Sequence, residues 1–227
     1  ASAGAIRSAR RLSTLKGRRA SGQFLAEGPQ AVREAVAAGV VARIFVTAAA
    51  ADRHDSVLDS ASTTGVEILM ATDSEIASLT DTVTPQGLVA VCRDRSWTLE
   101  QVLAEAPRLV VVCAQVRDPG NAGTVIRCAD AFGADAVVLT DGSVDAHNPK
   151  TVRATVGSLF HLPVVTGVSL AEATTRLREA GLLVIAADGS GEQDLLQTDL
   201  GRPIAWVFGN EAWGLPAADL ETCDLVA

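Results

Sequence analysis

Runs of apolar residues alternate with polar, helix-like segments along this chain, which predicts strands interleaved with helices. The second half holds five runs that are almost entirely apolar, as in the buried strands of a parallel sheet. These runs span residues 109–114, 136–140, 163–167, 182–187 and 204–209. After the first run, apolar side chains between Ala122 and Phe132 recur at helical spacing. This order predicts an α/β fold with a doubly wound parallel sheet.

The first half predicts a smaller unit of alternating helices and strands. Its strand-like segments span 42–47, 66–70 and 87–92, and its first helix begins at Pro29 and ends before Gly39. A more polar stretch follows and contains a short helix after Thr98, so we place the boundary between the two units near 95–97. The expected organisation is a basic arm over 1–20, a domain over 21–95, a linker over 96–108 and a second domain over 109–227.

Composition excludes several classes of protein. With 48% hydrophobic and 20% charged residues, the 227-residue chain can bury a large core, which excludes disorder as its main state. No apolar run approaches the ~20 residues that a membrane helix needs. The N-terminus is basic, but no apolar core of a signal peptide follows it. We therefore expect a cytoplasmic protein that does not bind a membrane.

No metal site is expected from the cysteines and histidines. The four cysteines, at 92, 113, 128 and 223, form no CxxC pair, and the three histidines lack metal-ligand spacing. Cys92, Cys113 and Cys128 lie in or beside apolar stretches, which is typical of buried, reduced thiols.

Positive charge is concentrated at the N-terminus, although the net charge is −8. The first 20 residues contain six basic side chains and no acidic one. The six are Arg7, Arg10, Arg11, Lys16, Arg18 and Arg19. A local basic segment can contact nucleic-acid phosphates even on an acidic protein, because such contacts are screened beyond roughly 10 Å. A frayed, solvated terminus explains the same pattern equally well.

Three loops that follow predicted strands carry the candidate chemistry, because ligands of open α/β sheets bind at the carboxyl ends of strands. The first loop contains Asn121, which is also a good N-cap for the next helix, and leads to Arg127. We expect Arg127 to be partly buried between Ile126 and Cys128, and a buried guanidinium needs an anion or a carbonyl partner. An ion pair with a nearby aspartate is the simpler explanation of that arginine alone.

The second loop contains Thr140, Asp141 and Gly142, and a helix N-terminus at Asn148 then offers a natural anion site, to which Lys150 and Arg153 add positive charge. Ordinary helix capping and a solvated face are the alternative. The third loop carries Gly209, Asn210 and Glu211 directly after a predicted strand. A plain strand-to-helix turn would also explain it.

Common nucleotide and hydrolase motifs are absent from the sequence. It contains no GxxxxGK[ST] loop, no GxGxxG and no GxSxG. Gly189 and Gly191 follow a strand without the third glycine, so a nucleotide-dependent oxidoreductase is a weak alternative.

Together and in this order, the three loops resemble the SpoU/TrmH family of RNA ribose 2′-O-methyltransferases, in the SPOUT superfamily. The matching stretches are 118–139, 141–164 and 206–216, and residues 24–36 resemble the L30e-like substrate-binding domain often fused to these enzymes. The resemblance implies a SPOUT-type α/β domain with a C-terminal trefoil knot, S-adenosylmethionine as cofactor and a homodimer with active sites near the subunit interface. The family pattern continues beyond the cysteine and aspartate at 223–224, so we expect the knot-closing tail to be missing here.

The resemblance also assigns roles to individual residues. It implies that Arg127 acts at the ribose hydroxyl, that Asn121 orients the ribose or Arg127, and that Glu211 orients substrate or pairs with Arg127. Cofactor-binding backbone is implied at Thr140, Asp141, Gly142, Gly209 and Asn210. RNA contacts are expected from the six basic residues of 1–20 and from Arg117, Lys150 and Arg153. The substrate implied is structured RNA, with 23S ribosomal RNA favoured over tRNA; tRNA methylation and a non-catalytic RNA-binding module remain alternatives.

Overall fold

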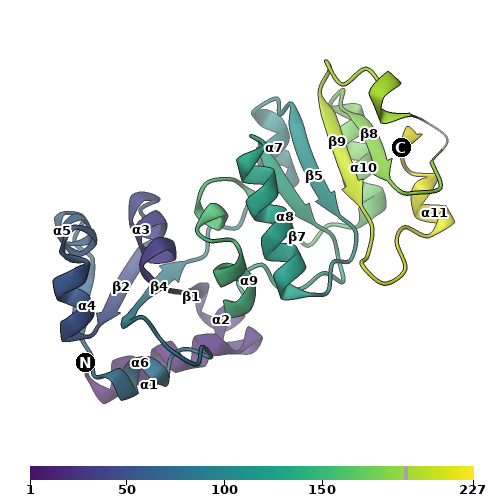
Figure 1. Ribbon diagram of the computed structural model, residues 1–227. Coiled ribbons are helices and arrows are strands. Elements are labelled where there is room, and N and C mark those ends of the chain that lie inside the picture. The colour runs from purple at the N-terminus through teal and green to yellow at the C-terminus, as the bar shows by residue number, and fades with distance from the viewer. Residues whose placement is uncertain (192–193) are drawn as a thin grey trace. The chain divides into compact units, whose positions relative to one another are not determined.

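The computed structural model describes residues 1–191 and 194–227, and the chain forms two compact units. The first unit comprises Ala1–Arg95 and His147–His161, and the second comprises Ser96–Ala146 and Leu162–Ala227 (Figure 1). The first division falls near 95–97, where the sequence predicted it. The segment that was expected to be a linker is part of the second unit instead, because its helix buries apolar side chains in that unit's core.

A four-stranded sheet in the order β1-β4-β2-β3 is the centre of the first unit. Strand β4 pairs antiparallel with β1 and β2, and β2 pairs parallel with β3. The strands are β1 (Gln23–Glu27), β2 (Val41–Val46), β3 (Glu67–Met70) and β4 (Leu88–Arg93). The last three were predicted. Strand β1 was missed because its apolar part is only three residues long, from Phe24 to Ala26.

Most α-helices of the first unit begin at polar caps or at proline. Thr47 caps one of them and Pro29 opens another, as its fixed φ favours. The helical segments are α1 (Ala3–Arg10), η1 (Arg11–Ser13), α2 (Leu15–Ser21), α3 (Pro29–Ala37), α4 (Ala48–Arg53), α5 (Asp55–Thr63), α6 (Asp73–Ala77), α9 (Pro149–Ala154) and η2 (Ser158–Phe160).

Residues 1–20 are neither a separate arm nor a frayed end, which corrects both expectations. They form α1, η1 and most of α2, and they bury Ile6, Ala9 and Leu12 in one core cluster with Leu25 and Phe45 of the sheet. These three apolar residues recur every third position, so the segment presents one apolar face to the sheet and its basic residues elsewhere. The N-terminal helices are therefore an integral part of the first unit.

The second unit is an all-parallel, six-stranded sheet in the order β10-β8-β9-β5-β6-β7. Its strands are β5 (Leu109–Cys113), β6 (Ala136–Leu139), β7 (Val164–Thr166), β8 (Leu183–Ala187), β9 (Ile204–Phe208) and β10 (Leu225–Val226). The first five coincide with the apolar runs and confirm the predicted α/β fold with a parallel sheet.

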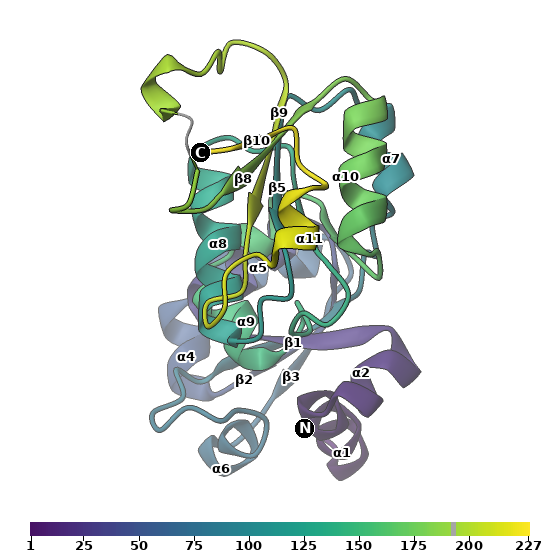
Figure 2. The same cartoon turned by 90° about the vertical axis from the view of Figure 1, so that its right-hand side faces the viewer.

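Helices cover the two faces of this sheet unequally. Helices α7 (Leu99–Ala104) and α10 (Leu170–Glu179) lie on one side of the sheet, and α8 (Pro119–Ala131) lies on the other (Figure 2). Leu99, Val102 and Leu177 pack with Val110 and Val184 in a fully buried cluster on the α7/α10 side. The remaining short helices are η3 (Leu195–Gln197) and α11 (Ala217–Leu220).

The strand order creates a switch point between β5 and β9. From β5 the chain adds β6 and then β7 on one side, and it later returns to place β8 and β9 on the other side. Strands β5 and β9 are thus hydrogen-bonded neighbours, in register from Leu109 with Ile204 to Cys113 with Phe208. Loops after two such strands diverge and leave a crevice, which is where open α/β sheets bind ligands.

None of the helices in residues 1–191 and 194–227 is both long and apolar enough to cross a membrane. No group of three or more histidine, cysteine, aspartate or glutamate side chains in those residues is arranged to hold a metal ion.

Candidate active site

A small cavity of about 220 Å³ lies at the β5–β9 switch point. Its walls come from the ends of both strands, from the loops that follow them and from the first turns of α8. The lining residues are Cys113, Val116, Asn121, Thr124, Val125, Phe208, Gly209 and Glu211. Three predicted site residues are therefore brought together although they come from two distant segments: Asn121 from the first, and Gly209 and Glu211 from the third loop.

The polar wall of this cavity is organised by Glu211. Its Oε1 atom accepts a hydrogen bond from the backbone N–H of Asp118 at 2.9 Å and another from Nδ2 of Asn121 at 3.2 Å. Asp118 also caps α8, since its Oδ1 accepts from the backbone N–H of Asn121 at 2.9 Å. The carboxylate of Glu211 thus lies at the N-terminus of α8, where the helix dipole favours negative charge.

These contacts hold Glu211 in its charged form. Hydrogen bonds from its own backbone N–H and then from that of Asp118 lower the pKa of Glu211, and the Asn121 amide adds to the effect. The predicted pairing of Glu211 with Arg127 is absent, because the carboxylate oxygen is engaged by Asp118 and Asn121 instead. Glu211 therefore connects the third loop to α8 and does not neutralise a cation.

The predicted start of α8 was wrong by about one turn. The N-cap is Asp118 with Pro119 at the first helical position, so Asn121 lies inside the first turn and its side chain is available to Glu211. Arg127 also differs from expectation, since it is exposed and not partly buried. Within residues 1–191 and 194–227, it has no hydrogen-bond or ion-pair partner. The ion pair that seemed the simpler explanation of this arginine does not form.

The third loop closes on itself tightly. Asn210 and Gly214 exchange two backbone hydrogen bonds, of 3.0 and 2.8 Å. A Cβ atom on Gly209 would lie 2.4 Å from the carbonyl carbon of Gly214, so position 209 admits only glycine without displacing the loop. Asn210 is buried; its Nδ2 donates to the backbone oxygen of Gln115 at 2.7 Å, and its Oδ1 accepts from Ala212 at 2.8 Å. The Asn210 side chain therefore joins the first and third loops and is not directed at a ligand.

Thr140 has a similar structural role in the second loop. Its hydroxyl donates to the carbonyl of Cys113 at 3.2 Å and accepts from the backbone N–H of Gln115 at 3.1 Å. Its own backbone N–H donates to the same carbonyl at 3.1 Å, so this N–H cannot bind a cofactor. Asp141 and Gly142 are exposed at the following turn, and Gly142 has a φ of 82° that favours glycine. This turn, rather than Thr140 itself, is the accessible part of the loop.

Arg117 and Trp213 form a cation–π pair at the edge of these loops. The guanidinium carbon of Arg117 lies 4.9 Å from the centre of the Trp213 ring, and both side chains are exposed. Sequence reasoning selected Arg117 but missed Trp213. The available signal was its place two residues after Glu211, as the one aromatic residue in the sequence of 209–216.

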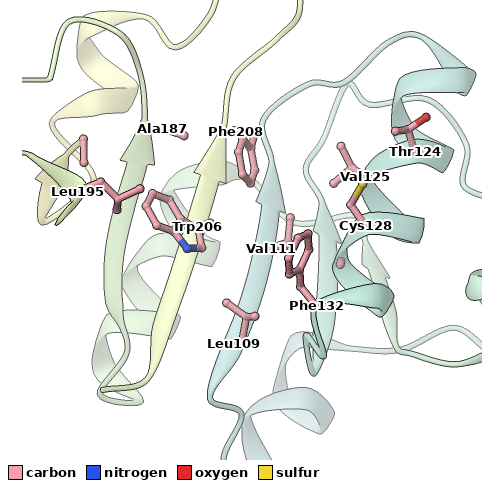
Figure 3. Close-up of a pocket in the computed structure, with 12 residues that line it drawn as sticks. Leu109, Val111, Thr124, Val125, Cys128, Phe132, Ala187, Leu195, Trp206 and Phe208 are labelled. Carbon is pink, nitrogen blue, oxygen red and sulfur yellow. The ribbon is translucent and has the colours of Figure 1, made fainter. Parts of the chain in front are cut away.

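A second, larger cavity of about 690 Å³ adjoins the first one (Figure 3). It lies between α8 and the β5–β9 strands and shares Thr124, Val125 and Phe208 with the small cavity. Its lining is mostly apolar: Leu109, Val111, Thr124, Val125, Cys128, Ala129, Phe132, Ala187, Leu195, Trp206, Phe208 and Ala227. Phe132 is 83% exposed and Phe208 is 40% exposed, so apolar side chains on the α8 side of the sheet are open to solvent.

The remaining predicted RNA contacts belong to the first unit. Arg153 of α9 donates to Glu27 at 3.1 Å and also to Asp81, whose pKa this hydrogen bond lowers. The guanidinium is thus engaged within the unit, which argues against the predicted phosphate contact. Lys150 is exposed, and its backbone N–H donates to Asn148, the predicted helix cap.

Among the six basic residues of 1–20, Arg18 differs from the others. It is buried, and its guanidinium donates to the backbone oxygens of Leu12 and Ser13 at 2.9 and 3.0 Å. It therefore closes the turn between the N-terminal helices, which argues against its predicted role as an RNA contact. The other five are exposed: Arg7, Arg10, Arg11, Lys16 and Arg19.

Two family models match this chain. Residues 108–227 match the SpoU rRNA Methylase family, and residues 4–90 match the MRM3-like substrate binding domain. The chain belongs to the SpoU rRNA methylase family. The family match thus covers the whole β5–β9 site, and the substrate-binding match covers most of the first unit.

Individual relatives and solved structures agree with this assignment. The chain is 38% identical to the 23S rRNA guanosine-2′-O-methyltransferase RlmP of Bacillus subtilis, over 95% of this chain and 83% of that protein. An rRNA methyltransferase from Sinorhizobium meliloti superposes with a TM-score of 0.86 at 28% identity, over 100% of this chain and 86% of the other. The SpoU methyltransferase AviRb from Streptomyces viridochromogenes, solved with the cofactor AdoMet, superposes with a TM-score of 0.85 at 27% identity. This match covers 98% of this chain and 87% of AviRb.

Proposed function

We propose that this protein transfers a methyl group from S-adenosylmethionine to the 2′-hydroxyl of a ribose in 23S ribosomal RNA. One observation carries the proposal: Glu211 fixes Asn121 at the switch-point cavity, while Arg127 stays exposed and unpaired within residues 1–191 and 194–227. The relatives named as 23S rRNA 2′-O-methyltransferases support this substrate class. A ribosomal RNA substrate would place the reaction in the cytoplasm.

The site has the features needed to hold S-adenosylmethionine. An apolar wall that includes Val116 and Phe208 suits an adenine ring, and the exposed turn at Asp141 and Gly142 provides backbone and carboxylate groups close to the first loop. Gly209 lets the third-loop backbone form one side of the cavity. When bound, the cofactor supplies an electrophilic methyl group on a sulfonium and leaves as a neutral thioether.

The side chains of this chain would then position and activate the ribose. The Arg127 guanidinium would stabilise negative charge that develops on the 2′-oxygen and grip the adjacent phosphate. A guanidinium keeps its protons at neutral pH, so Arg127 would not serve as the base that removes the hydroxyl proton. Asn121, restrained by Glu211, would orient the ribose, and this restraint lowers the entropy cost of reaching the reactive geometry.

We further propose that the protein works as a homodimer. What supports this is the open apolar side of the second unit, where Phe132 and Phe208 remain exposed beside the site. Such apolar patches are unusual on a monomer. Sedimentation velocity at several protein concentrations would test this, and a monomer mass at micromolar concentrations would contradict it.

The decisive experiment is transfer of labelled methyl from S-adenosylmethionine to deproteinised total RNA, followed by digestion to nucleosides. Label in a 2′-O-methyl nucleoside from 23S RNA is the expected result. Label in tRNA would show that tRNA, and not 23S RNA, is the substrate. Label on a base would overturn the proposed mechanism of ribose methylation. Cofactor binding without any label, under conditions where a 23S fragment binds, would indicate a non-catalytic RNA-binding module.

A further inference from the structure

The exposed indole of Trp213 is not explained by the fold or by the chemistry derived above. Trp213 is 49% exposed, although a tryptophan gains most when its ring is buried. It is not among the residues that line either cavity beside the site. The ring belongs to the same loop as Gly209 and Glu211, which line the smaller cavity, so it lies at the rim of that site and is open to solvent.

The position of Trp213 is fixed by its loop. It lies between Asn210 and Gly214, whose mutual backbone hydrogen bonds close the loop, and Asn210 is itself buried and bonded to Gln115. Its neighbour two positions earlier is Glu211, which is bonded to Asp118 and Asn121. An aromatic ring on such a restrained loop loses little entropy when it binds a partner.

Arg117 covers one face of the ring and adds positive charge to it. The Arg117 guanidinium carbon lies 4.9 Å from the ring centre, and Arg117 directly precedes Asp118, the N-cap of α8. The pair thus combines a flat aromatic surface with a cation, next to the residues proposed to act on the ribose. Single-stranded nucleic acid is bound by this combination, because bases stack on aromatic rings while cations contact the phosphates.

We propose that Trp213 and Arg117 form a stacking platform for a base of the RNA substrate, adjacent to the ribose that is methylated. This rests on the proposed function and deepens it, because it names the part of the substrate that the rim contacts. Stacking accepts any base, so the platform would hold the nucleotide in place without reading its identity. The phosphate of the same nucleotide would lie within reach of the Arg117 guanidinium.

Two observations favour an RNA base over the adenine of the cofactor. Trp213 is outside the lining of the switch-point cavity proposed to hold the cofactor. In addition, the positive charge of Arg117 would repel the sulfonium of S-adenosylmethionine but attract a phosphodiester.

The test uses the full chain and a 23S RNA fragment that the wild-type protein methylates. Trp213→Ala is expected to raise the KM for RNA on the order of 10-fold to 100-fold, while Trp213→Phe retains most of the affinity. The KM for S-adenosylmethionine should stay the same in both variants. Trp97→Phe is the matched control, because Trp97 is 37% exposed but lies outside the site loops.

RNA fragments with an abasic site at the target nucleotide or at either neighbour then identify the stacked base. An abasic site at one of these positions should raise the KM for RNA of the wild-type protein as much as Trp213→Ala does. In the Trp213→Ala variant, the same abasic site should raise the KM for RNA no further. Wild-type KM for RNA in Trp213→Ala would overturn the platform, and so would an increased KM for the cofactor alone. If the wild-type protein methylated no RNA at all, the proposed function itself would fail, so the two failures are distinguishable.

Discussion

Glu211 accepts a hydrogen bond from the side chain of Asn121 at 3.2 Å, although the two residues are 90 positions apart in the sequence. The contact joins the loop after β9 to the first turn of α8, and Asp118 shares the same carboxylate oxygen. The geometry of the candidate site therefore depends on a contact between segments that are distant in the sequence.

Replacing Arg127 should remove catalysis and leave the cofactor site intact. Arg127→Ala is expected to lower kcat by about 100-fold or more, as when a donor that stabilises developing negative charge is removed. Arg127→Lys should also be defective, because an ammonium cannot reproduce the planar fork of the guanidinium. Methyl transfer and cofactor binding by calorimetry would be measured on each variant. Near wild-type turnover in Arg127→Ala would remove this residue from the mechanism.

Replacing Glu211 should impair the reaction through Asn121. In Glu211→Ala the amide of Asn121 and the N–H of Asp118 both lose their acceptor, so we expect kcat to fall on the order of 10-fold or more. Glu211→Gln keeps a carbonyl oxygen as an acceptor, so its kcat should fall less. Combining Glu211→Ala with Asn121→Ala should lower kcat little more than the more damaging single substitution does, because the two residues act as a unit. Additive losses would show that they act separately.

The pH dependence follows from the lowered pKa of Glu211. A carboxyl group with a lowered pKa in the folded protein contributes stability that is fully present above its unfolded pKa of about 4.3. That contribution is lost as the pH falls through the lower folded-state pKa. The loop should therefore keep its structure throughout the neutral range, and only acid below about pH 4.3 should release it. Thermal unfolding from pH 3 to pH 8 would detect the change, and in Glu211→Gln this acid-dependent part should disappear.

Arg153 should matter for stability rather than for RNA affinity. Arg153→Met leaves the mostly buried carboxylate of Glu27 without its cation, which we expect to destabilise the first unit by about 1–3 kcal/mol. The thermal midpoint should fall by several degrees. Adding Glu27→Gln should recover part of the loss, because the unpaired charge is removed. A large drop in RNA affinity with an unchanged midpoint would restore Arg153 as a phosphate contact.

The N-terminal helices should bind RNA through their exposed cations. Replacing Arg7, Arg10, Arg11 and Arg19 with glutamine should weaken RNA binding and flatten its dependence on salt, with little change in the midpoint of unfolding. Arg18→Gln is the matched control, since this buried residue should lower the midpoint and leave the salt dependence unchanged. Deleting residues 1–20 should unfold the first unit, because the core loses Ile6, Ala9 and Leu12. An unchanged salt dependence in the fourfold variant would contradict an RNA contact here.

The sequence predicted what depends on local pattern and missed what depends on distant partners. Apolar runs located strands β5 to β9 because a buried parallel strand is apolar on both faces, but they gave no sign of the two-residue strand β10. The charges of the first 20 residues concealed the apolar spacing of Ile6, Ala9 and Leu12, and the segment was interpreted as an arm. The partner of Arg153 could not be found from sequence, because Glu27 is 126 residues away. The trefoil knot remains a prediction.

The surroundings of the cysteines make this chain selectively reactive toward thiol reagents. Burial raises the pKa of Cys92 well above its ordinary value and that of Cys113 to about 12. Partial burial also raises the pKa of Cys223. Because the thiolate is the reactive form, these three thiols react slowly near neutral pH. Cys128 is exposed on α8, directly after Arg127, and lines the open apolar cavity (Figure 3). A maleimide dye would thus attach first at Cys128 in a single protomer, and the proposed homodimer, which would cover the same apolar side, would slow that attachment.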